Sequence, residues 1–353
     1  MGNSTGNSNK AEDLWVRFAD EVEQRNFSVR RENDPPLIPS EPKVTVQPHV
    51  WNWNEVRELI DEAGRLVELG GATGSERRGL RLINPGLPYG STHTLWGTIQ
   101  LVKPGEVAFA HRHTPSALRF IIEGIGAFTT VEGEEYPMER GDFLLAPSWA
   151  WHEHENVGTE DTIWLDVLDI SLVRLLQSSF FEMHPDKKQS VGTIPNPSLR
   201  KYGSGKFRPV GEAGKYVPAA VPVYKYSEAY AALQQIREFP PDPCDGYILE
   251  YINPTDGGHV MDTIACYLQL LIPGVETKAH KHTNSCLYHV YSGEGISIVD
   301  GKELQWKTGD TFAVPPWASH KHINTSQTSE AILFSATDRP VYEKLGLYRE
   351  KPE

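Results

Sequence analysis

Two stretches of this chain repeat one another at a constant offset, and this repeat limits the possible folds more than any other feature. Pro104-Gly105 recurs as Pro273-Gly274, and His111-x-His113 recurs as His280-x-His282, each 169 residues later. Further matches keep an offset of 169 or 168: Asn84-Pro85 with Asn253-Pro254, Thr94 with Thr263, Ser116 with Ser285, Gly141-Asp142 with Gly309-Asp310, Pro147 with Pro315, Trp149 with Trp317, and Asn156 with Asn324. Self-similarity of this kind indicates a tandem duplication of one structural unit.

Each copy has the pattern of an all-β unit. Short β-prone runs alternate with Gly, Pro and Asp turns over about 80–170 and again over about 249–340, which favours a sandwich or barrel. Apolar residues with helical spacing predict helices over 11–26, 52–69 and 227–237. The predicted organisation is an N-terminal tail and helical arm (1–75), a first β domain (76–185), a connecting segment (186–245) and a second β domain (246–353).

The charge and cysteine content exclude several classes of protein. The net charge of -13 argues against nucleic acid and anionic membranes as partners. No apolar run is long enough to cross a bilayer. Cys244, Cys266 and Cys286 cannot all pair, and we expect reduced core cysteines in a cytoplasmic protein.

Eight of the 13 histidines lie in four His-x-His pairs. Side chains two positions apart in a strand share one face, so each pair offers two imidazoles to one site. An isolated pair is usually an ordinary buried or exposed pair, but these recur in both copies. The pairs are His111/His113, His152/His154, His280/His282 and His320/His322.

The repeated motifs resemble those of the cupin superfamily, whose fold is a double-stranded β-helix jelly-roll barrel. In the first copy they read Gly105-x5-His111-x-His113 and Gly141-x5-Pro147-x4-His152-x3-Asn156. The resemblance implies a mainly β chain of two tandem cupin barrels with an N-terminal helical arm. It favours His152 over His154 as the third metal ligand, so His154 is assigned to the surroundings of the metal or to the substrate.

One cupin ligand is missing from both copies. Cupins usually carry a Glu a few residues after the second histidine, where this chain has Ala117 or Leu118, and Cys286 or Leu287 in the repeat. The implied metal ligands are therefore three neutral histidines. Such ligands suit Zn, Cu, Fe or Ni and leave the charge of the ion uncompensated, which favours an anionic chelating substrate.

Among cupins, the run from His111 to Gly124 resembles gentisate 1,2-dioxygenases and their salicylate and 1-hydroxy-2-naphthoate dioxygenase relatives. This family uses Fe(II) and O2 to open an aromatic ring between the carboxyl-bearing carbon and the adjacent hydroxyl-bearing carbon, and gentisate gives maleylpyruvate. The same resemblance is carried by Glu76-Arg77-Arg78, Asn84-Pro85-Gly86-Leu87, Trp149-Ala150-Trp151-His152 and Trp164-Leu165-Asp166-Val167-Leu168-Asp169.

The resemblance also suggests substrate contacts in the first copy. A guanidinium grips a carboxylate with two hydrogen bonds, which makes Arg119 the first candidate for binding the substrate carboxylate. His154 and Asp166 are candidates for bonding ring substituents or moving protons. The further candidates are Arg77, Arg81, Trp96, Gln100 and Trp164.

The second copy keeps the ligands but loses the other groups. It retains His280, His282 and His320, a possible second metal site. Its replacements are Tyr288 for Arg119, Ala265 for Trp96, Ser335 for Asp166 and Glu250 for Arg81. We therefore expect catalysis in the first copy, and a second copy that binds metal only for structural reasons, if it does so.

Four interpretations remain open. The substrate is gentisate in the first interpretation, and salicylate, a substituted salicylate or 1-hydroxy-2-naphthoate in the second. The others are a non-catalytic metal-binding bicupin and a different tri-histidine cupin of the flavonol or oxalate type. The family also suggests a homotetramer, with the helical arm crossing to a neighbouring subunit.

Overall fold

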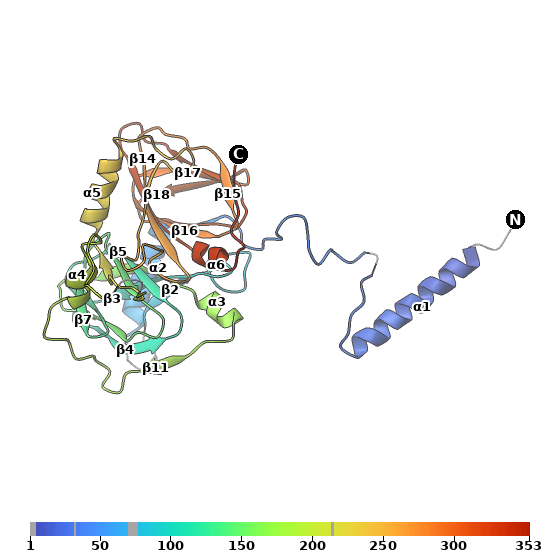
Figure 1. Ribbon diagram of the computed structural model, residues 1–353, viewed down its shortest axis with the longest axis horizontal. Helices are drawn as coiled ribbons and strands as arrows, with labels where there is room; N and C mark the ends of the chain where they lie inside the picture. The colour runs from blue at the N-terminus through green and yellow to red at the C-terminus, as the bar shows by residue number, and fades with distance from the viewer. Residues whose placement is uncertain (1–4, 32, 70–76, 213–214) are drawn as a thin grey trace. The chain divides into compact units, whose positions relative to one another are not determined.

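The computed structural model describes residues 5–31, 33–69, 77–212 and 215–353. The chain divides into two compact units, Met1–Lys43 and Val44–Glu353. The first contains helix α1 (Thr5–Gln24), which begins six residues before the apolar pattern that predicted it. The second contains the other described elements (Figure 1). The predicted boundary at residues 75 and 76 lies outside the described residues.

The first repeat forms a barrel of two antiparallel sheets, as the cupin motifs predicted. Within the described residues, one sheet has the order β12-β8-β5-β10-β3-β2 and the other β11-β4-β9-β6-β7. Gly105 and Gly141 have φ of 79° and 86°, and each makes a tight turn before a strand. The strands are β2 (Gly79–Leu82), β3 (Trp96–Val102), β4 (Val107–His113), β5 (Ala117–Glu123), β6 (Ala127–Val131), β7 (Glu134–Met138), β8 (Phe143–Ala146), β9 (His152–Asn156), β10 (Thr162–Leu168), β11 (Phe181–Met183) and β12 (Val223–Tyr224).

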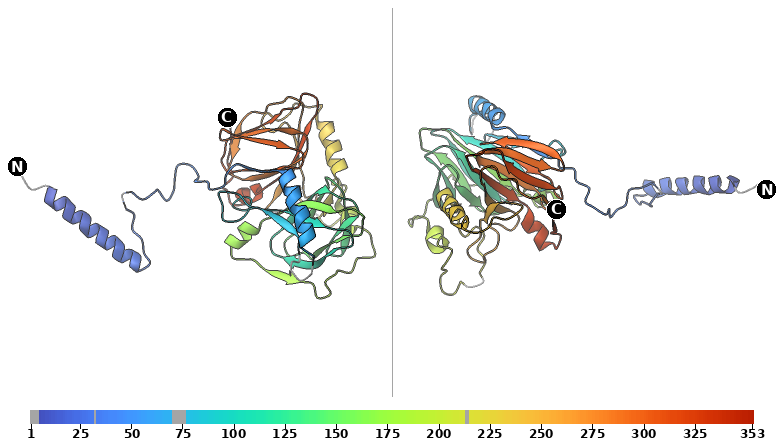
Figure 2. Two further views of the ribbon diagram at one scale, coloured as in Figure 1. Left: turned by 180° about the vertical axis from the view of Figure 1, so that it is seen from behind. Right: turned by 90° about the horizontal axis from the view of Figure 1, so that it is seen from above.

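The second repeat forms the same barrel, coloured orange to red in Figures 1 and 2. Its described sheets have the orders β1-β19-β16-β21-β14-β13 and β18-β17-β20-β15-β22. The fold class is therefore the predicted pair of tandem cupin barrels. The strands are β1 (His49–Trp51), β13 (Tyr247–Glu250), β14 (Ala265–Leu271), β15 (His280–His282), β16 (Cys286–Ser292), β17 (Glu294–Val299), β18 (Lys302–Lys307), β19 (Thr311–Val314), β20 (His320–Asn324), β21 (Ala331–Thr337) and β22 (Glu350–Pro352).

Each barrel is preceded by a segment whose strand pairs with one barrel and whose helix packs on the other. Strand β1 pairs with β19 of the second barrel, and helix α2 (Trp53–Leu66) then packs on β2 and β3 of the first. Conversely, β12 pairs with β8 of the first barrel, and helix α5 (Tyr226–Ile236) packs on β13 and β14 of the second. The remaining helices are α3 (Ile170–Leu175), α4 (Pro197–Tyr202) and α6 (Arg339–Lys344).

Aspartates of the repeated Gly-Asp motif fix these two helices at their first residues. The backbone N–H of Trp53 donates to Asp310 of the second barrel at 2.6 Å, and that of Tyr226 donates to Asp142 of the first at 3.1 Å. A carboxylate at a helix N-terminus satisfies an otherwise unpaired N–H and the helix dipole. The repeated motif thus ties each barrel to the helix of the other.

The two barrels share one hydrophobic core. Phe120 of β5 and Phe334 of β21 stack with ring centroids 4.3 Å apart and 19° between the ring planes, and both are fully buried. The same core cluster includes Leu118 and Leu287, equivalent positions of the two copies. Burial of large aromatic side chains is among the strongest contributions to a core, so this contact holds the two barrels firmly against each other.

Two buried aspartates, one from each barrel, join the barrels through reciprocal hydrogen bonds. Asp169 accepts a backbone hydrogen bond from Ser116 of its own barrel at 2.8 Å and a hydroxyl bond from Thr263 of the other at 2.6 Å. Asp338 accepts in the same way from Ser285 (2.7 Å) and from Thr94 of the first barrel. Burial raises the pKa of Asp169 to about 6, and these hydrogen bonds partly offset that cost.

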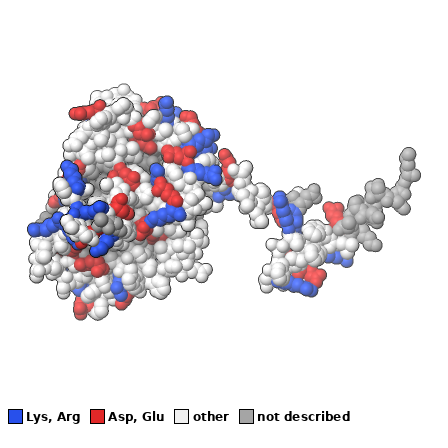
Figure 3. Space-filling view, viewed as in Figure 1, with Lys and Arg blue, Asp and Glu red and all other residues white. Residues whose placement is uncertain are grey.

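The described helices include none that is both long and apolar enough to cross a bilayer. The three cysteines are free, and Cys266 and Cys286 are buried as predicted, whereas Cys244 is half-buried. Acidic and basic side chains are interspersed over the face of the Val44–Glu353 unit seen in Figure 3.

Replacement of Thr263 by Val should destabilise the protein, because it leaves buried Asp169 without its cross-barrel donor. An unsatisfied buried acceptor costs about 1–3 kcal/mol, which a denaturant unfolding curve resolves. Thr328→Val, at an exposed position of the same barrel, serves as the control and should change stability by less than about 0.5 kcal/mol. Equal effects of the two substitutions would show that the Asp169 contact does not hold the barrels together.

Candidate metal centre

The register of two strands brings three histidines together in the first barrel. His111 and His113 lie on β4, and His152 is the first residue of β9. The pairing of β4 with β9 shifts by one residue between Ala108 and His111, so that His111 lies directly opposite His152. Such an irregularity re-aims the side chains of one strand relative to its partner.

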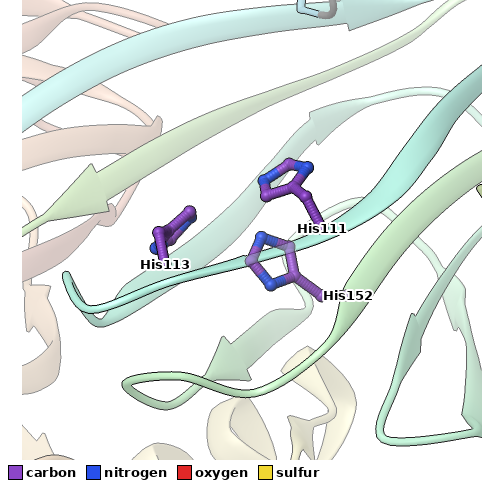
Figure 4. Close-up of side chains that lie close together, drawn as sticks. All are labelled: His111, His113 and His152. Atoms are coloured by element: carbon purple, nitrogen blue, oxygen red, sulfur yellow. The ribbon is translucent and has the colours of Figure 1, made fainter. Parts of the chain in front are cut away.

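The three side chains point toward one another from these two strands (Figure 4). One ligand atom from each of His111, His113 and His152 lies within 4.8 Å of the others. The ring centroid of His152 is 4.5 Å from that of His111 and 4.8 Å from that of His113. His154 also faces the interior but does not join this group, and its centroid is 6.2 Å from that of His152.

Backbone carbonyls orient two of the rings. The Nδ1 of His113 lies 2.7 Å from the carbonyl of Pro115, and the Nδ1 of His152 lies 3.0 Å from that of Ala150. Because a carbonyl only accepts, each Nδ1 carries the proton and each Nε2 keeps its lone pair for a metal. The Nδ1 of His111 differs, because it lies 3.2 Å from the carbonyl of Phe109, an acceptor, and 2.6 Å from the Nη2 of Arg77, a donor. The donor set therefore fits a bound transition metal.

The environment keeps the triad neutral. Burial lowers the pKa of His111 to about 2, assisted by the charge of Arg77, and lowers the pKa of His113 to about 4. Burial and the charge of Arg119 lower the pKa of His152 well below its usual range. Neutral imidazole is the form that binds a metal, so the site is prepared for an ion at neutral pH.

A strained turn at Trp149 positions His152. Trp149 has φ of 64°, a conformation that bulky side chains rarely adopt, and its N–H donates to the carbonyl of His113 at 2.8 Å. Trp317 of the second barrel has φ of 58° and donates to the carbonyl of His282 in the same way. Both barrels therefore tie the turn before the third histidine to the strand that carries the first two.

Arg77 reaches the triad, which sequence spacing alone did not indicate. Its Nη2 lies 2.6 Å from the Nδ1 of His111 and 3.3 Å from the carbonyl of Phe109. The ring of Phe181, on the edge strand β11, lies 5.2 Å from that of His111. Glu76, from the same sequence motif as Arg77, lies outside the described residues.

A buried ion pair lies beside the triad. Arg119 on β5 and Asp166 on β10 are cross-strand partners, and their Nε and Oδ1 are 3.4 Å apart. Gln100 on β3 donates a short hydrogen bond to the other carboxylate oxygen of Asp166. Burial raises the pKa of Asp166, and the charge of Arg119 opposes that rise. A buried carboxylate needs a partner, and Asp166 has two, Arg119 and Gln100.

Two hydrogen-bond donors of Arg119 lack a well-aligned acceptor within the described part of the chain. Its side chain is 2% exposed, and its Nε and Nη1 have no well-aligned hydrogen-bond acceptor among the described residues. Burial accordingly lowers the pKa of Arg119. Buried donors are nearly always satisfied, so donors without a well-aligned acceptor next to a metal-type triad indicate a place for a ligand with acceptor oxygens.

The remaining predicted residues surround this centre to different degrees. His154 is buried, its Nδ1 lies 2.9 Å from the hydroxyl of Thr129, and its ring is 5.0 Å from that of fully buried Trp164. Trp96 is half-buried, and the guanidinium of Arg81 lies 5.6 Å from its ring centre. Arg81 itself is exposed, which sets it apart from the buried residues around the triad.

The second barrel has a matching triad. His280, His282 and His320 are all buried, and their ligand atoms also lie within 4.8 Å of one another. His280 lies directly opposite His320, as His111 lies opposite His152.

Comparison with known proteins agrees with this geometry. The family model of the cupin domain matches residues 98–168 and 267–337. The chain is 40% identical to 5-aminosalicylate 1,2-dioxygenase of Comamonas sp., covering 89% of this chain and 84% of that protein, and 39% identical to gentisate 1,2-dioxygenase 1 of Aquipseudomonas alcaligenes, covering 89% of each. A solved structure of salicylate 1,2-dioxygenase from Pseudoaminobacter salicylatoxidans with gentisate superposes with a TM-score of 0.86 at 30% identity, over 100% of this chain and 95% of that one.

Dioxygenases consume O2, and a buried histidine triad implies a bound metal. The level of identity, the nearly complete coverage and the shared two-barrel fold lead to one conclusion. The chain belongs to the gentisate and salicylate 1,2-dioxygenase family of bicupin ring-cleaving oxidoreductases.

Proposed function

We propose that the first barrel binds Fe(II) through His111, His113 and His152 and uses O2 to cleave an aromatic 2-hydroxycarboxylate between the carboxyl-bearing and hydroxyl-bearing carbons. The preferred reaction in this proposal is gentisate to maleylpyruvate. The observation that carries it is the buried Arg119 guanidinium, whose Nε and Nη1 lack well-aligned acceptors beside a neutral triad.

Charge explains why the substrate should be an anionic chelate. Three neutral imidazoles leave the full charge of a divalent ion uncompensated, and Arg77 and Arg119 add positive charge nearby. A carboxylate with an adjacent hydroxyl supplies oxygen ligands and negative charge together. Imidazole suits iron among other metals, and when bound, iron supplies the chemistry that lets O2 react with the ring.

The protein side chains have the task of holding and orienting the ring. Arg119 donates to the substrate carboxylate, while Asp166 and Gln100 fix the guanidinium plane. His154, held by Thr129, is placed to bond a ring substituent or move a proton. Arg77 adds a second cation, and the further residues proposed to line the ring are Arg81, Trp96 and Trp164.

The second candidate is a salicylate, substituted-salicylate or 1-hydroxy-2-naphthoate 1,2-dioxygenase. It is favoured by the relative from Comamonas, which is named for 5-aminosalicylate and is at least as similar to this chain as the gentisate enzyme. The same iron and carboxylate contacts serve all these substrates, which differ mainly in the substituents away from the chelating pair. A non-catalytic bicupin does not explain why Arg119 is buried with unsatisfied donors.

We further propose a homo-oligomer, a tetramer by family resemblance, in the cytoplasm. Support for association comes from α1, on which Leu14, Trp15 and Phe18 are about half exposed, so that an apolar stripe has no cover within the Met1–Lys43 unit. The three free cysteines agree with a reducing compartment.

The protein loaded anaerobically with Fe(II) should consume one O2 per substrate molecule when gentisate is added, and the product should contain both oxygen atoms. Oxygen uptake and mass spectrometry of the ring-opened acid measure this. Salicylate and 1-hydroxy-2-naphthoate are compared at the same concentration, and faster turnover of either selects the second candidate. 5-Aminosalicylate represents the substituted salicylates in the same comparison. If none of these four substrates causes oxygen uptake, both candidates are contradicted.

Arg119→Ala should raise KM and lower kcat while iron remains bound. Loss of a charge-assisted hydrogen bond costs about 1.5–3 kcal/mol, so kcat/KM should fall about 10- to 100-fold. Benzoate inhibition should weaken by a similar factor, whereas inhibition by phenol, which lacks the carboxylate, should not change. Exposed Arg140→Ala is the matched control. Equal weakening of benzoate and phenol would show that Arg119 only shapes the pocket.

A further inference from the structure

Backbone carbonyls orient two histidine rings of the second triad, as they do in the first. The Nδ1 of His282 lies 2.9 Å from the carbonyl of Asn284, and the Nδ1 of His320 lies 2.9 Å from that of Ala318. These bonds match those of His113 and His152, so each ring again directs Nε2 inward. The Nε2 of His320 is buried with no hydrogen-bond partner among the described residues.

The cavity at this triad is small and contains unsatisfied polar atoms. Its volume is about 70 Å³, whereas organic ligands usually occupy pockets of about 300–1,000 Å³. Buried atoms of three lining residues, His280 Nδ1, Tyr267 Oη and Asn284 Oδ1, have no hydrogen-bond partner within the described part of the chain. A hydrated ion would satisfy such atoms, and the volume equals about two waters at about 30 Å³ each.

Aromatic residues line the cavity at the second triad. Tyr288 stands at the position of Arg119 and is buried against Phe312, with ring centroids 4.8 Å apart. Tyr267 and Tyr348 also line the cavity, at the positions of Thr98 and Ser179 in the first copy. The second cavity therefore lacks both the room for an aromatic acid and a counterpart of Arg119.

The charge of the second cavity is also reversed. Asp245 and Glu350 line it, and the lining cation Arg339 is already paired with Glu343 at 2.6 Å. Glu350 lies directly opposite His282, because β22 pairs with β15. In the first barrel the equivalent edge strand β11 places Phe181 opposite His113. A carboxylate thus takes the place of an apolar ring, and it favours a cation instead of an anion.

We propose that His280, His282 and His320 hold a divalent transition-metal ion in a small site lined by Asp245 and Glu350, whose carboxylates balance its charge. The ion takes no aromatic substrate and stabilises the second barrel together with strand β22. Each chain therefore binds two metal ions, of which only the one in the first barrel takes part in ring cleavage. This inference goes beyond the proposed function and does not require it.

Metal content after loading the full chain with Zn(II) alone and removing the excess tests the proposal without any substrate. The wild type should retain two equivalents, His111→Ala one, His280→Ala one, and the double variant none. Under the proposed function, His280→Ala loaded with iron keeps its ring cleavage and His111→Ala loses it. One equivalent in both the wild type and His280→Ala would overturn the second site, whatever the activity results.

A variant outside the triad covers the case in which His280→Ala does not fold. Glu350→Gln removes one balancing charge. Substitution of residues that surround metal ligands typically lowers metal affinity about 10- to 100-fold. Transfer of one of the two Zn(II) ions to a chelator should become at least about 10-fold faster. Glu353→Gln is the matched control, because Glu353 directly follows β22 and its carboxylate accepts a hydrogen bond from Ser319. Its rate of Zn(II) transfer should equal that of the wild type. An unchanged transfer rate in Glu350→Gln would overturn the charge-balance proposal.

Discussion

The cross-strand register of the histidines is the constraint on which both sites depend. Side chains alternate between the two faces of a strand, so a slip of one residue would turn His111 and His113 away from His152. The shift between Ala108 and His111 sets this register, and a backbone bond from Trp149 to the carbonyl of His113 holds the following turn against it. The metal-type geometry is therefore a property of backbone pairing, and the surrounding side chains decide how it is used.

Duplication gave the chain two copies of this geometry with opposite surroundings. In the first copy, Arg119 and Arg77 present positive charge to a neutral triad, which suits an anionic chelating ligand. In the second, Tyr288 stands at the position of Arg119 and Glu350 brings negative charge, which suits an ion alone. In our proposal, identical histidine triads serve different purposes because the side chains around them differ in charge and volume.

Much of the fold and of the candidate site could be predicted, because the repeat and the motif spacing are local features of the sequence. The tandem barrels and the α5 helix were predicted correctly. The contacts of Arg77 and Phe181 with His111 were missed, since both come from segments whose position depends on tertiary structure. The recurrence of Thr94 as Thr263 was visible in the sequence, but only the structure explains it, as the pair of cross-barrel bonds to Asp338 and Asp169.

A crystal structure of the Fe(II)-loaded protein with gentisate, prepared without oxygen, tests the central claim most directly. The account predicts gentisate in the first barrel only, with its carboxylate bonded to Arg119 and its ring beside His154. It predicts an ion without an organic ligand at His280. Gentisate bound in the second barrel, or a carboxylate in the first that does not contact Arg119, would contradict the account.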